Sequence, residues 1–211
     1  MMQHKSITGH QIAVGGSDRF EDRMKRIAMS YRSDASVKAS SDSPWLTLRV
    51  EPGREKAVKN LLDDDHIEAL VPMRKGPELR RRGRVIPAVM IPVMACYVLV
   101  RCRVTDRALI GLKSFDHVRD VLGGCTSPRL VSAEEVNVFK AKAEEGAYDY
   151  ERPQVQFKRG ERVRISEGPF AAHFGDIVSC RAEAKGDAVV EVTFFAMKIP
   201  AVIPLALLEK V

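Results

Sequence analysis

The segment from Phe157 to Val178 constrains the fold of this chain more than any other part of the sequence. Residues 162–165 alternate polar and apolar side chains, as a strand with one buried face does. Gly168-Pro169 then marks a turn, because proline fixes φ and glycine tolerates positive φ. A second apolar run, Ile177-Val178, follows. A strand, a glycine-bounded loop with two phenylalanines and a returning strand predict the start of a small β-barrel.

The remainder of the C-terminal region continues this pattern. Lys185-Gly186-Asp187 predicts a tight turn, residues 189–195 and 199–203 predict two strands, and Leu207-Leu208 begins a short last one. Several short strands in residues 157–211 are typical of an SH3-like barrel. The run 201–208 alone is also compatible with a helix.

Residues 45–146 predict a different architecture, an α+β domain with helices packed on a mostly antiparallel sheet. Alternating or continuous apolar residues indicate strands, and apolar stripes at helical spacing indicate helices. Thr105 is a predicted helix cap, and Ser132 with Glu135 forms a predicted capping box. The expected strands cover residues 45–50, 67–73, 97–104 and 118–122, and the expected helices cover residues 54–62, 105–112 and 132–145.

Two further segments have the composition of connecting regions. Residues 1–44 are rich in Ser, Asp, Gly and Lys, and we expect a partly disordered extension with a possible helix over 18–31, capped at Ser17. The apolar residues at helical spacing in this segment predict a docking face. Because isolated helices of this length are marginal in water, a disordered extension is the alternative. These residues are Phe20, Met24, Ile27 and Tyr31. Residues 147–156 predict an interdomain linker.

Charge and composition restrict the class of protein. The net charge of +6 and the pI of about 9.2 make an anionic partner plausible, although a basic surface also serves solubility alone. No apolar run reaches the ~18 residues that span a bilayer, and residues 1–12 lack the apolar core of a secretory signal. The four cysteines show no metal-binding spacing, which favours structural thiols in a reducing compartment. We therefore expect a cytoplasmic monomer without membrane contact, metal or cofactor.

From residue 45 to the end, the chain resembles the NusG/Spt5 family of transcription elongation factors, in which an NGN domain precedes a KOW domain. Trp45 opens the first strand, as in that family, and residues 52–55 match the turn before its first helix. Tyr97 to Val100 matches the second half of its Phe-Pro-Gly-Tyr-Val-Leu-Val signature. In the second domain, residues 160–164 and 168–175 follow the KOW motif. The resemblance implies an NGN domain with an antiparallel sheet and packed helices, then an SH3-like KOW barrel.

The resemblance also implies a binding function. The NGN domain of this family docks on the clamp helices of the RNA polymerase β′ subunit, bridges toward the β subunit side of the cleft and touches upstream or non-template DNA weakly. Carried over to this chain, Trp45, Met94 and Tyr97 line the polymerase pocket; a half-buried core role is the alternative for Tyr97. The basic segment lies against DNA phosphates, or is a solvated loop. It comprises Arg80, Arg81, Arg82 and Arg84.

The KOW domain of the family recruits a second partner, such as Rho or ribosomal protein uS10. The matching partner-binding residues here are Phe170, His173, Phe174, Phe195 and Met197. The chain departs from the family in three places. Met94-Ala95-Cys96 replaces Phe-Pro-Gly, Phe194 to Met197 replaces an apolar-Phe-Gly-Arg turn, and Val202 and Pro204 occupy positions that usually carry acids or polar residues. These changes put Rho or uS10 binding in doubt and suggest a specialised paralogue of the RfaH type, acting in antitermination.

Two other classes of protein compete with this interpretation. An enzyme would have to use the acidic run Asp63-Asp64-Asp65 with His66, but adjacent residues at a helix end point in different directions. The sequence contains no phosphate loop, nucleophile elbow or zinc-protease motif. A ribosome-associated KOW-type RNA-binding protein is the alternative function, against which the NGN-like half argues.

Overall fold

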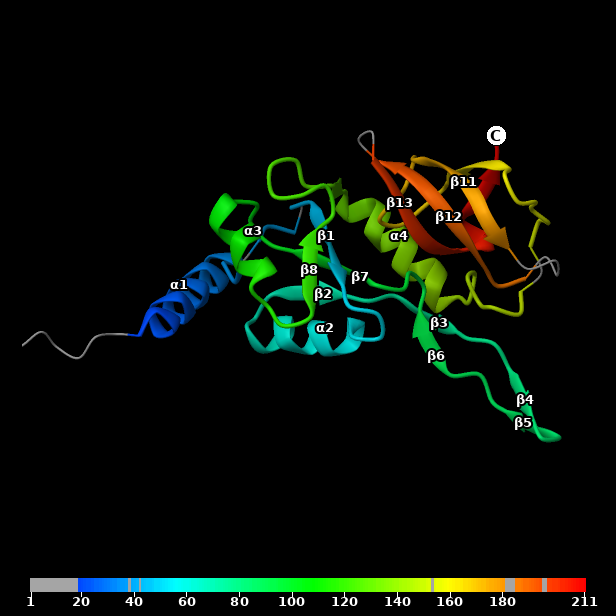
Figure 1. The fold of residues 1–211 in the computed structure, drawn as a ribbon, viewed down its shortest axis with the longest axis horizontal. Helices are drawn as coiled ribbons and strands as arrows, with labels where there is room; N and C mark the ends of the chain where they lie inside the picture. Colours follow the sequence, from blue (N-terminus) through cyan, green and yellow to red (C-terminus); the bar gives the residue numbers. More distant parts are fainter. Residues whose placement is uncertain (1–18, 38, 42, 153, 181–184, 195–196) are drawn as a thin grey trace, which may run out of the picture.

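The structure, a computed structural model, describes residues 19–37, 39–41, 43–152, 154–180, 185–194 and 197–211 (Figure 1). The helices are α1 (Phe20–Ala35), α2 (Glu55–Asp64), α3 (Asp106–Lys113) and α4 (Ala133–Glu144), with the 3-10 turn η1 (Leu205–Leu207). The first strands are β1 (Trp45–Val50), β2 (Glu68–Leu70), β3 (Met73–Lys75), β4 (Leu79–Arg81), β5 (Arg84–Ile86), β6 (Met90–Pro92) and β7 (Tyr97–Arg101). The later strands are β8 (Val118–Val121), β9 (Leu130–Val131), β10 (Arg162–Ile165), β11 (Phe174–Cys180), β12 (Asp187–Phe194), β13 (Met197–Pro204) and β14 (Leu208–Lys210).

The described part of residues 45–146, called here the sheet domain, is built on one antiparallel sheet. Its strand order is β2-β7-β1-β8, and β9 pairs with the start of β1. Leu46, Leu48, Val98 and Val100 alternate to one face and join a core that includes residues of α2 and α3. The prediction of helices packed on an antiparallel sheet is therefore confirmed.

The helices of the sheet domain begin where the sequence provides caps. The Thr105 hydroxyl accepts a hydrogen bond from the Ala108 amide at 3.2 Å, at the start of α3. At α4, Ser132 and Glu135 form the predicted capping box, in which each side chain accepts from the other residue's amide. These bonds satisfy amides that have no partner inside the helix. The predicted apolar face of α4 is buried, as expected: Val136, Phe139 and Ala143.

Helix α1 packs on α3 through its last two turns. A Cβ added at Gly111 of α3 would lie 2.3 Å from the carbonyl oxygen of Tyr31, so glycine permits the close approach of the two helices. Arg32 donates a 2.9 Å hydrogen bond to the Ser114 hydroxyl beside this contact. The helix begins at Phe20 after Arg19, and the predicted cap Ser17 lies outside the described residues. Its first half projects from the body of the molecule (Figure 1).

A long arm leaves the sheet domain between β2 and β7. Strands β3 and β6 pair at its base, and β4 and β5 pair at its tip. The turn between β4 and β5 places Arg82 and Gly83 at positive φ, as a tight two-residue hairpin requires. The two strands and this turn form a hairpin, which extends away from both domains (Figure 1).

Residues of 157–211 that the structure describes form a second antiparallel sheet, called here the barrel. Its strand order is β13-β12-β11-β10-β14. The predicted alternation is present in β10, where Val163 and Ile165 are buried and Arg162 and Arg164 are exposed. The run that sequence left ambiguous forms β13, η1 and the start of β14, so this segment is not an α-helix.

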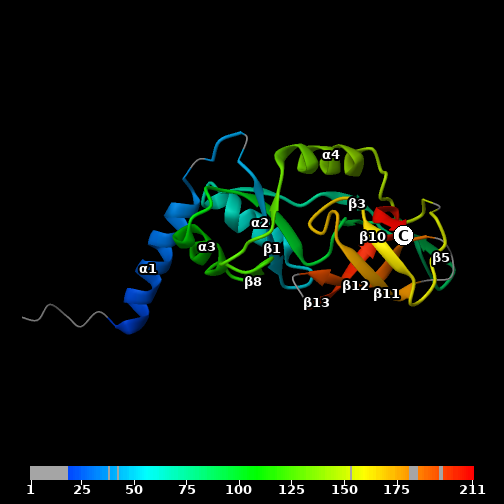
Figure 2. The same ribbon diagram turned by 90° about the horizontal axis from the view of Figure 1, so that it is seen from above.

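The sheet domain and the barrel share one hydrophobic core. It joins Trp45, Tyr97 and Leu99 of the central sheet and Phe139 of α4 to barrel residues such as Phe170. Figure 2 shows α1 at one end of the long axis, the barrel at the other and the central sheet between them. Among the described residues, no helix has the length and apolar character needed to cross a membrane.

Candidate functional site

The residues that the resemblance assigns to polymerase binding lie on or beside the second face of the central sheet. The ladder between β1 and β7 places Trp45 opposite Arg101 and Arg49 opposite Tyr97. Because side chains alternate along a strand, these four side chains share the face that is opposite to α2 and α3. Met94 lies just before β7 and joins the same core. Trp45, Met94 and Tyr97 are only 5%, 3% and 6% exposed, respectively.

The barrel covers Tyr97. Its ring meets Phe170 edge to face with centroids 5.2 Å apart, and Phe170 in turn meets Phe194 at 6.3 Å. Burial raises the pKa of the Tyr97 hydroxyl to about 12, and the nearby Arg49 opposes that rise. The tyrosine is therefore neutral at physiological pH and packs as an apolar ring. The three proposed contact residues are brought together but are not open to solvent.

A buried carboxylate fixes the turn that carries Met94 and Tyr97. The backbone of Cys96 has a φ of 69°, a left-handed conformation that residues other than glycine rarely adopt. The Glu55 carboxylate, 4% exposed, accepts a 2.7 Å hydrogen bond from the Cys96 amide. The Cys96 carbonyl accepts from the Val50 amide at 2.8 Å. These bonds hold the turn against β1 and the start of α2.

Arg74, at the base of the arm, is tied to the barrel by a buried ion pair. Its guanidinium, 3% exposed, lies 2.6 Å from the Asp187 carboxylate at the start of β12. It also donates to the Tyr148 carbonyl at 3.1 Å. The backbone continues this link, since Tyr150 donates to Lys75 and accepts from Gly186. The first half of the predicted linker therefore packs between the arm and the barrel.

A second polar contact involves the same Tyr148 through its side chain. Glu167 of the barrel accepts hydrogen bonds from the Tyr148 hydroxyl and from Lys142 of α4. Burial, followed by the hydrogen bond to Glu167, raises the pKa of Tyr148. Arg129 donates to the Ala171 carbonyl at 3.0 Å. Polar bonds thus surround the apolar contact between Tyr97 and Phe170.

The predicted partner-binding residues of the barrel do not form one surface. Phe170 is fully buried, and His173 stacks on Phe194 with centroids 4.8 Å apart. Phe174 is 40% exposed, and the guanidinium of Arg162 lies 5.7 Å from its ring centroid. Met197 is 60% exposed at the start of β13. Phe195 lies outside the described residues.

The predicted DNA-contacting residues do share one exposed element. Arg80, Arg81, Arg82 and Arg84 all lie in the exposed β4–β5 tip, and Arg81 is directly opposite Arg84. Within the described part of the chain, no ion pair neutralises any of these four side chains. Leu79 and Ile86, a cross-strand pair, are also exposed on the hairpin. The tip presents a dense positive charge on a thin element.

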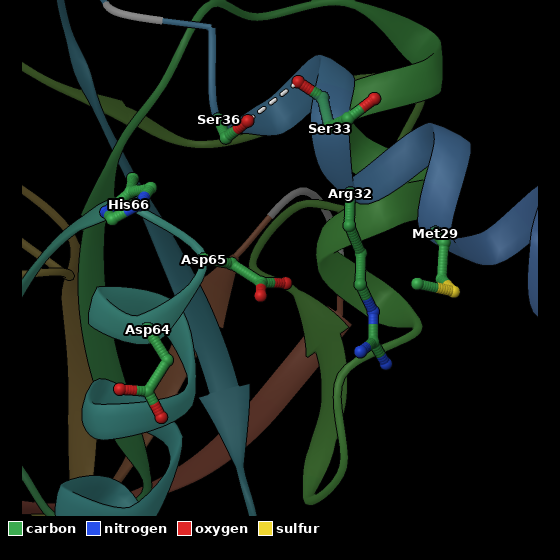
Figure 3. Close-up of a pocket in the computed structure, with 7 residues that line it drawn as sticks. All are labelled: Met29, Arg32, Ser33, Ser36, Asp64, Asp65 and His66. Atoms are coloured by element: carbon green, nitrogen blue, oxygen red, sulfur yellow. Dashed lines mark hydrogen bonds between the residues drawn. The ribbon is translucent and has the colours of Figure 1, made fainter.

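The acidic run considered for catalysis lines a cleft of about 330 Å³ between α1 and the end of α2 (Figure 3). The side chains of Asp64, Asp65 and His66 point in different directions in Figure 3. Among the described residues, no group of three or more His, Cys, Asp or Glu side chains is arranged to hold a metal ion. This cleft is far from Tyr97 and carries no arrangement that indicates catalysis.

Sequence reasoning did not identify four charged residues around Tyr97. Glu55, Arg74 and Asp187 hold the turn and the barrel in place, and Arg49 is exposed beside the tyrosine. The sequence did indicate the position of Arg49. Arg49 lies four residues after Trp45 in an alternating strand, so the two side chains share one face of the sheet. Nothing in the sequence indicates the pairing of Arg74 with Asp187.

Comparison with known proteins finds similarity to transcription termination factors. Residues 43–140 match the family model described as NusG, transcription termination factor nusG. The transcription termination/antitermination protein NusG of Neisseria meningitidis is 27% identical over 79% of this chain and 97% of its own length. The protein of the same name from Campylobacter jejuni is 26% identical, over 81% of this chain and 99% of its own.

Solved structures also match this chain. The structure "Domain interaction in Thermotoga maritima NusG" matches with 22% identity and a TM-score of 0.41, covering 83% of this chain and 99% of that one. An MjSpt4:Spt5 complex matches with 16% identity and a TM-score of 0.27, covering 79% of this chain and 97% of that one.

Proposed function

Because this chain is similar to NusG transcription termination/antitermination proteins over most of its length, we propose that it is a factor of the NusG family and binds RNA polymerase through Trp45, Met94 and Tyr97. The observation that carries the proposal is the apolar face on which Tyr97 meets Phe170. A surface that packs aromatic and methionine side chains against one apolar partner is suited to pack them against another. The helices of the polymerase β′ clamp are the expected ligand, with a further contact toward the β subunit.

The described arrangement is then a closed form of the factor. Phe170 occupies the place that the polymerase must take, so the barrel has to move before Tyr97 becomes available. Movement would also free Phe170 and His173 for a second partner, such as Rho or ribosomal protein uS10. Since the two events use the same interface, polymerase binding and exposure of the barrel are coupled.

A covered site is consistent with a specialised factor of the RfaH type. A factor that is closed in solution has reduced apparent affinity for polymerase until a signal opens it. The basic β4–β5 tip is the element best placed to read such a signal from upstream or non-template DNA, since its four arginines have no intramolecular ion pairs in the described structure. The closed form is consistent with a monomer. We propose that this monomer acts in antitermination of selected transcripts.

The test is binding of the full-length protein to core RNA polymerase, measured by co-elution and by titration. We expect Tyr97→Ala to weaken binding by about thirtyfold or more, because an aromatic anchor at an interface centre contributes ~2 kcal/mol or more. Met94→Asp should have a larger effect. Val138→Ala, an exposed apolar truncation on α4, is the matched control and should bind as the wild type does.

Two outcomes contradict the proposal. Equal polymerase affinity for the wild type and a folded Tyr97→Ala variant would remove this face from the interface. Co-sedimentation of the wild type with ribosomal subunits after a high-salt wash, without binding to polymerase, would favour the ribosome-associated RNA-binding alternative. Circular dichroism and thermal melting of each variant establish that it is folded.

A further inference from the structure

We infer that the seam between β13 and the β1–β8 edge of the sheet domain, centred on Arg49, is where a partner segment first enters. The segment is an apolar helix or loop that carries a carboxylate, and the Arg49 guanidinium pairs with that carboxylate. The inference rests on the proposed function and names the chemistry of the polymerase segment that begins to displace the barrel.

The first support is the position of Arg49. It lies directly opposite Tyr97 in the β1–β7 ladder, on the same face of the sheet. Tyr97 is buried under the barrel, whereas Arg49 is exposed. Clefts of about 430 Å³ and 270 Å³ lie beside Arg49, and Ile199 and Pro200 of β13 also line both. Arg49 is therefore the part of the covered face that a partner can reach while the barrel is still in place.

The second support is the charge balance around the seam. Three other cations on its rim or beside it are each paired with an acid. Arg119 lies 2.9 Å from Glu51, Lys198 lies 2.8 Å from Glu191, and Lys113 lies 3.1 Å from Asp120. The Arg49 side chain has no hydrogen bond or ion pair among the residues that the structure describes.

This balance favours a protein segment over a nucleic acid. A nucleic acid backbone presents a row of phosphates and is bound by several unpaired cations together. A single unpaired guanidinium suits one carboxylate, which it holds in a charge-assisted hydrogen bond. The basic tip of the arm, where four unpaired arginines lie close together, is the surface that fits phosphates.

The third support is the apolar lining of the larger cleft. Leu122 lies on the sheet domain side, and Met197 and Ile199 lie on the barrel side. Met197 is among the exposed large hydrophobic residues, and its flexible thioether adapts to different apolar partners. A partner with one acid flanked by apolar side chains matches this lining and the charge of Arg49.

The fourth support is the way β13 lies in the molecule. It is the edge strand of the barrel sheet and pairs only with β12. Pro200 and Pro204 in β13 lack the amide hydrogen that a further strand would need. The seam is therefore closed by side-chain packing rather than by a β-ladder, so a partner can separate it without breaking paired strands.

The experiment measures association of the full-length protein with core RNA polymerase at several salt concentrations, with no nucleic acid present. We expect Arg49→Gln to reduce the association rate about fivefold to tenfold at low salt and to flatten its salt dependence, because an interface charge accelerates encounter electrostatically. Arg49→Glu should reduce the rate further. Arg119→Gln, an exposed arginine already paired with Glu51, is the control and should change the rate less than twofold.

The possible results separate this inference from the proposed function. If the wild type does not bind polymerase either alone or with DNA present, both are wrong. Only the inference is overturned if the wild type binds polymerase and Tyr97→Ala weakens that binding, but Arg49→Gln associates as fast as the wild type does. A loss of affinity in Arg49→Gln that appears only when DNA is added would assign Arg49 to phosphate and would also overturn the inference.

Discussion

Glu55 shows how one buried carboxylate determines the shape of the candidate site. Its side chain accepts from the Cys96 amide, and a 3.3 Å contact to the Gly53 amide adds a second bond. Without these acceptors, the left-handed Cys96 would lose the contact that holds its turn against α2. Met94 and Tyr97, on either side of the turn, depend on that geometry. A residue that is not part of the apolar contact thus positions it.

At this scale we predict that Glu55→Ala lowers the free energy of unfolding by about 1–3 kcal/mol, since a buried amide is left without its acceptor. The same variant should weaken polymerase binding, because the turn loses its fixed conformation. Urea unfolding and polymerase titration measure the two effects. Glu144→Ala, at an exposed position on α4, is the control and should stay within about 0.5 kcal/mol of the wild type. A stability equal to that of the wild type would show that Glu55 does not hold the turn.

Single residues were predictable from the sequence where local rules apply. Ser132, Glu135 and Thr105 cap helices through bonds that span only three residues, so their roles could be predicted from spacing. Tyr97 could be assigned to the right sheet face, but its burial depends on Phe170, which is distant in the chain. The roles of Arg74 and Asp187 likewise come from the packing of two domains, which no local pattern encodes.

Among the elements, the β4–β5 hairpin has the clearest separate role. Two-stranded hairpins gain little stability by themselves, and this one has exposed side chains on every residue of its strands. Its four arginines therefore lie outside the core, and we propose that they bind DNA. An element with this composition can be altered without disturbing the shared core.

We predict that Arg81→Gln with Arg84→Gln weakens binding to DNA and lowers the slope of log affinity against log salt by about two, since each lost phosphate contact removes ~0.9 from that slope for duplex DNA. Fluorescence anisotropy with a labelled duplex measures both. The double variant Lys56→Gln with Lys140→Gln has the same net charge and serves as the control. If both double variants reduce the slope equally, the effect comes from total charge and the hairpin has no special role.

The elements themselves were largely predictable, with differences at their ends. The helices α2, α3 and α4 lie where apolar stripes and caps indicated them. The strand expected over residues 67–73 is instead β2 followed by β3, because β2 pairs with β7 in the central sheet and β3 pairs with β6 in the arm. The sequence shows apolar residues through both, but it does not show that the chain changes its pairing partner. Helix α1 extends to Ala35, past the expected end, because its last turns pack on α3.

At the scale of the whole molecule, the closed arrangement depends on an apolar contact with polar bonds at its borders. The Arg74–Asp187 pair connects the arm to the barrel, and the Glu167 bonds connect α4 to it. Buried ion pairs add little net stability when intact, yet removal of one partner leaves an unpaired buried charge. The pair is therefore a sensitive point at which to open the molecule.

We predict that Asp187→Ala destabilises the closed arrangement by about 3 kcal/mol, because Arg74 remains buried without its carboxylate. The variant should show a larger radius of gyration in small-angle X-ray scattering and a higher affinity for polymerase. Glu191→Ala, which breaks the exposed pair with Lys198 on the same strand, is the control and should scatter as the wild type does. Unchanged scattering with unchanged polymerase affinity would contradict a closed form held by this pair.

The order of the two domains along the chain has a consequence for synthesis. The ribosome completes the sheet domain first, and Phe170 and the strands that cover Tyr97 are made afterwards. At ~5–20 residues per second, the rest of the chain takes several seconds to appear. During that interval the nascent protein presents an uncovered apolar face that the finished protein hides. Under the proposed function, each molecule passes once through the polymerase-binding form before the barrel closes over Tyr97.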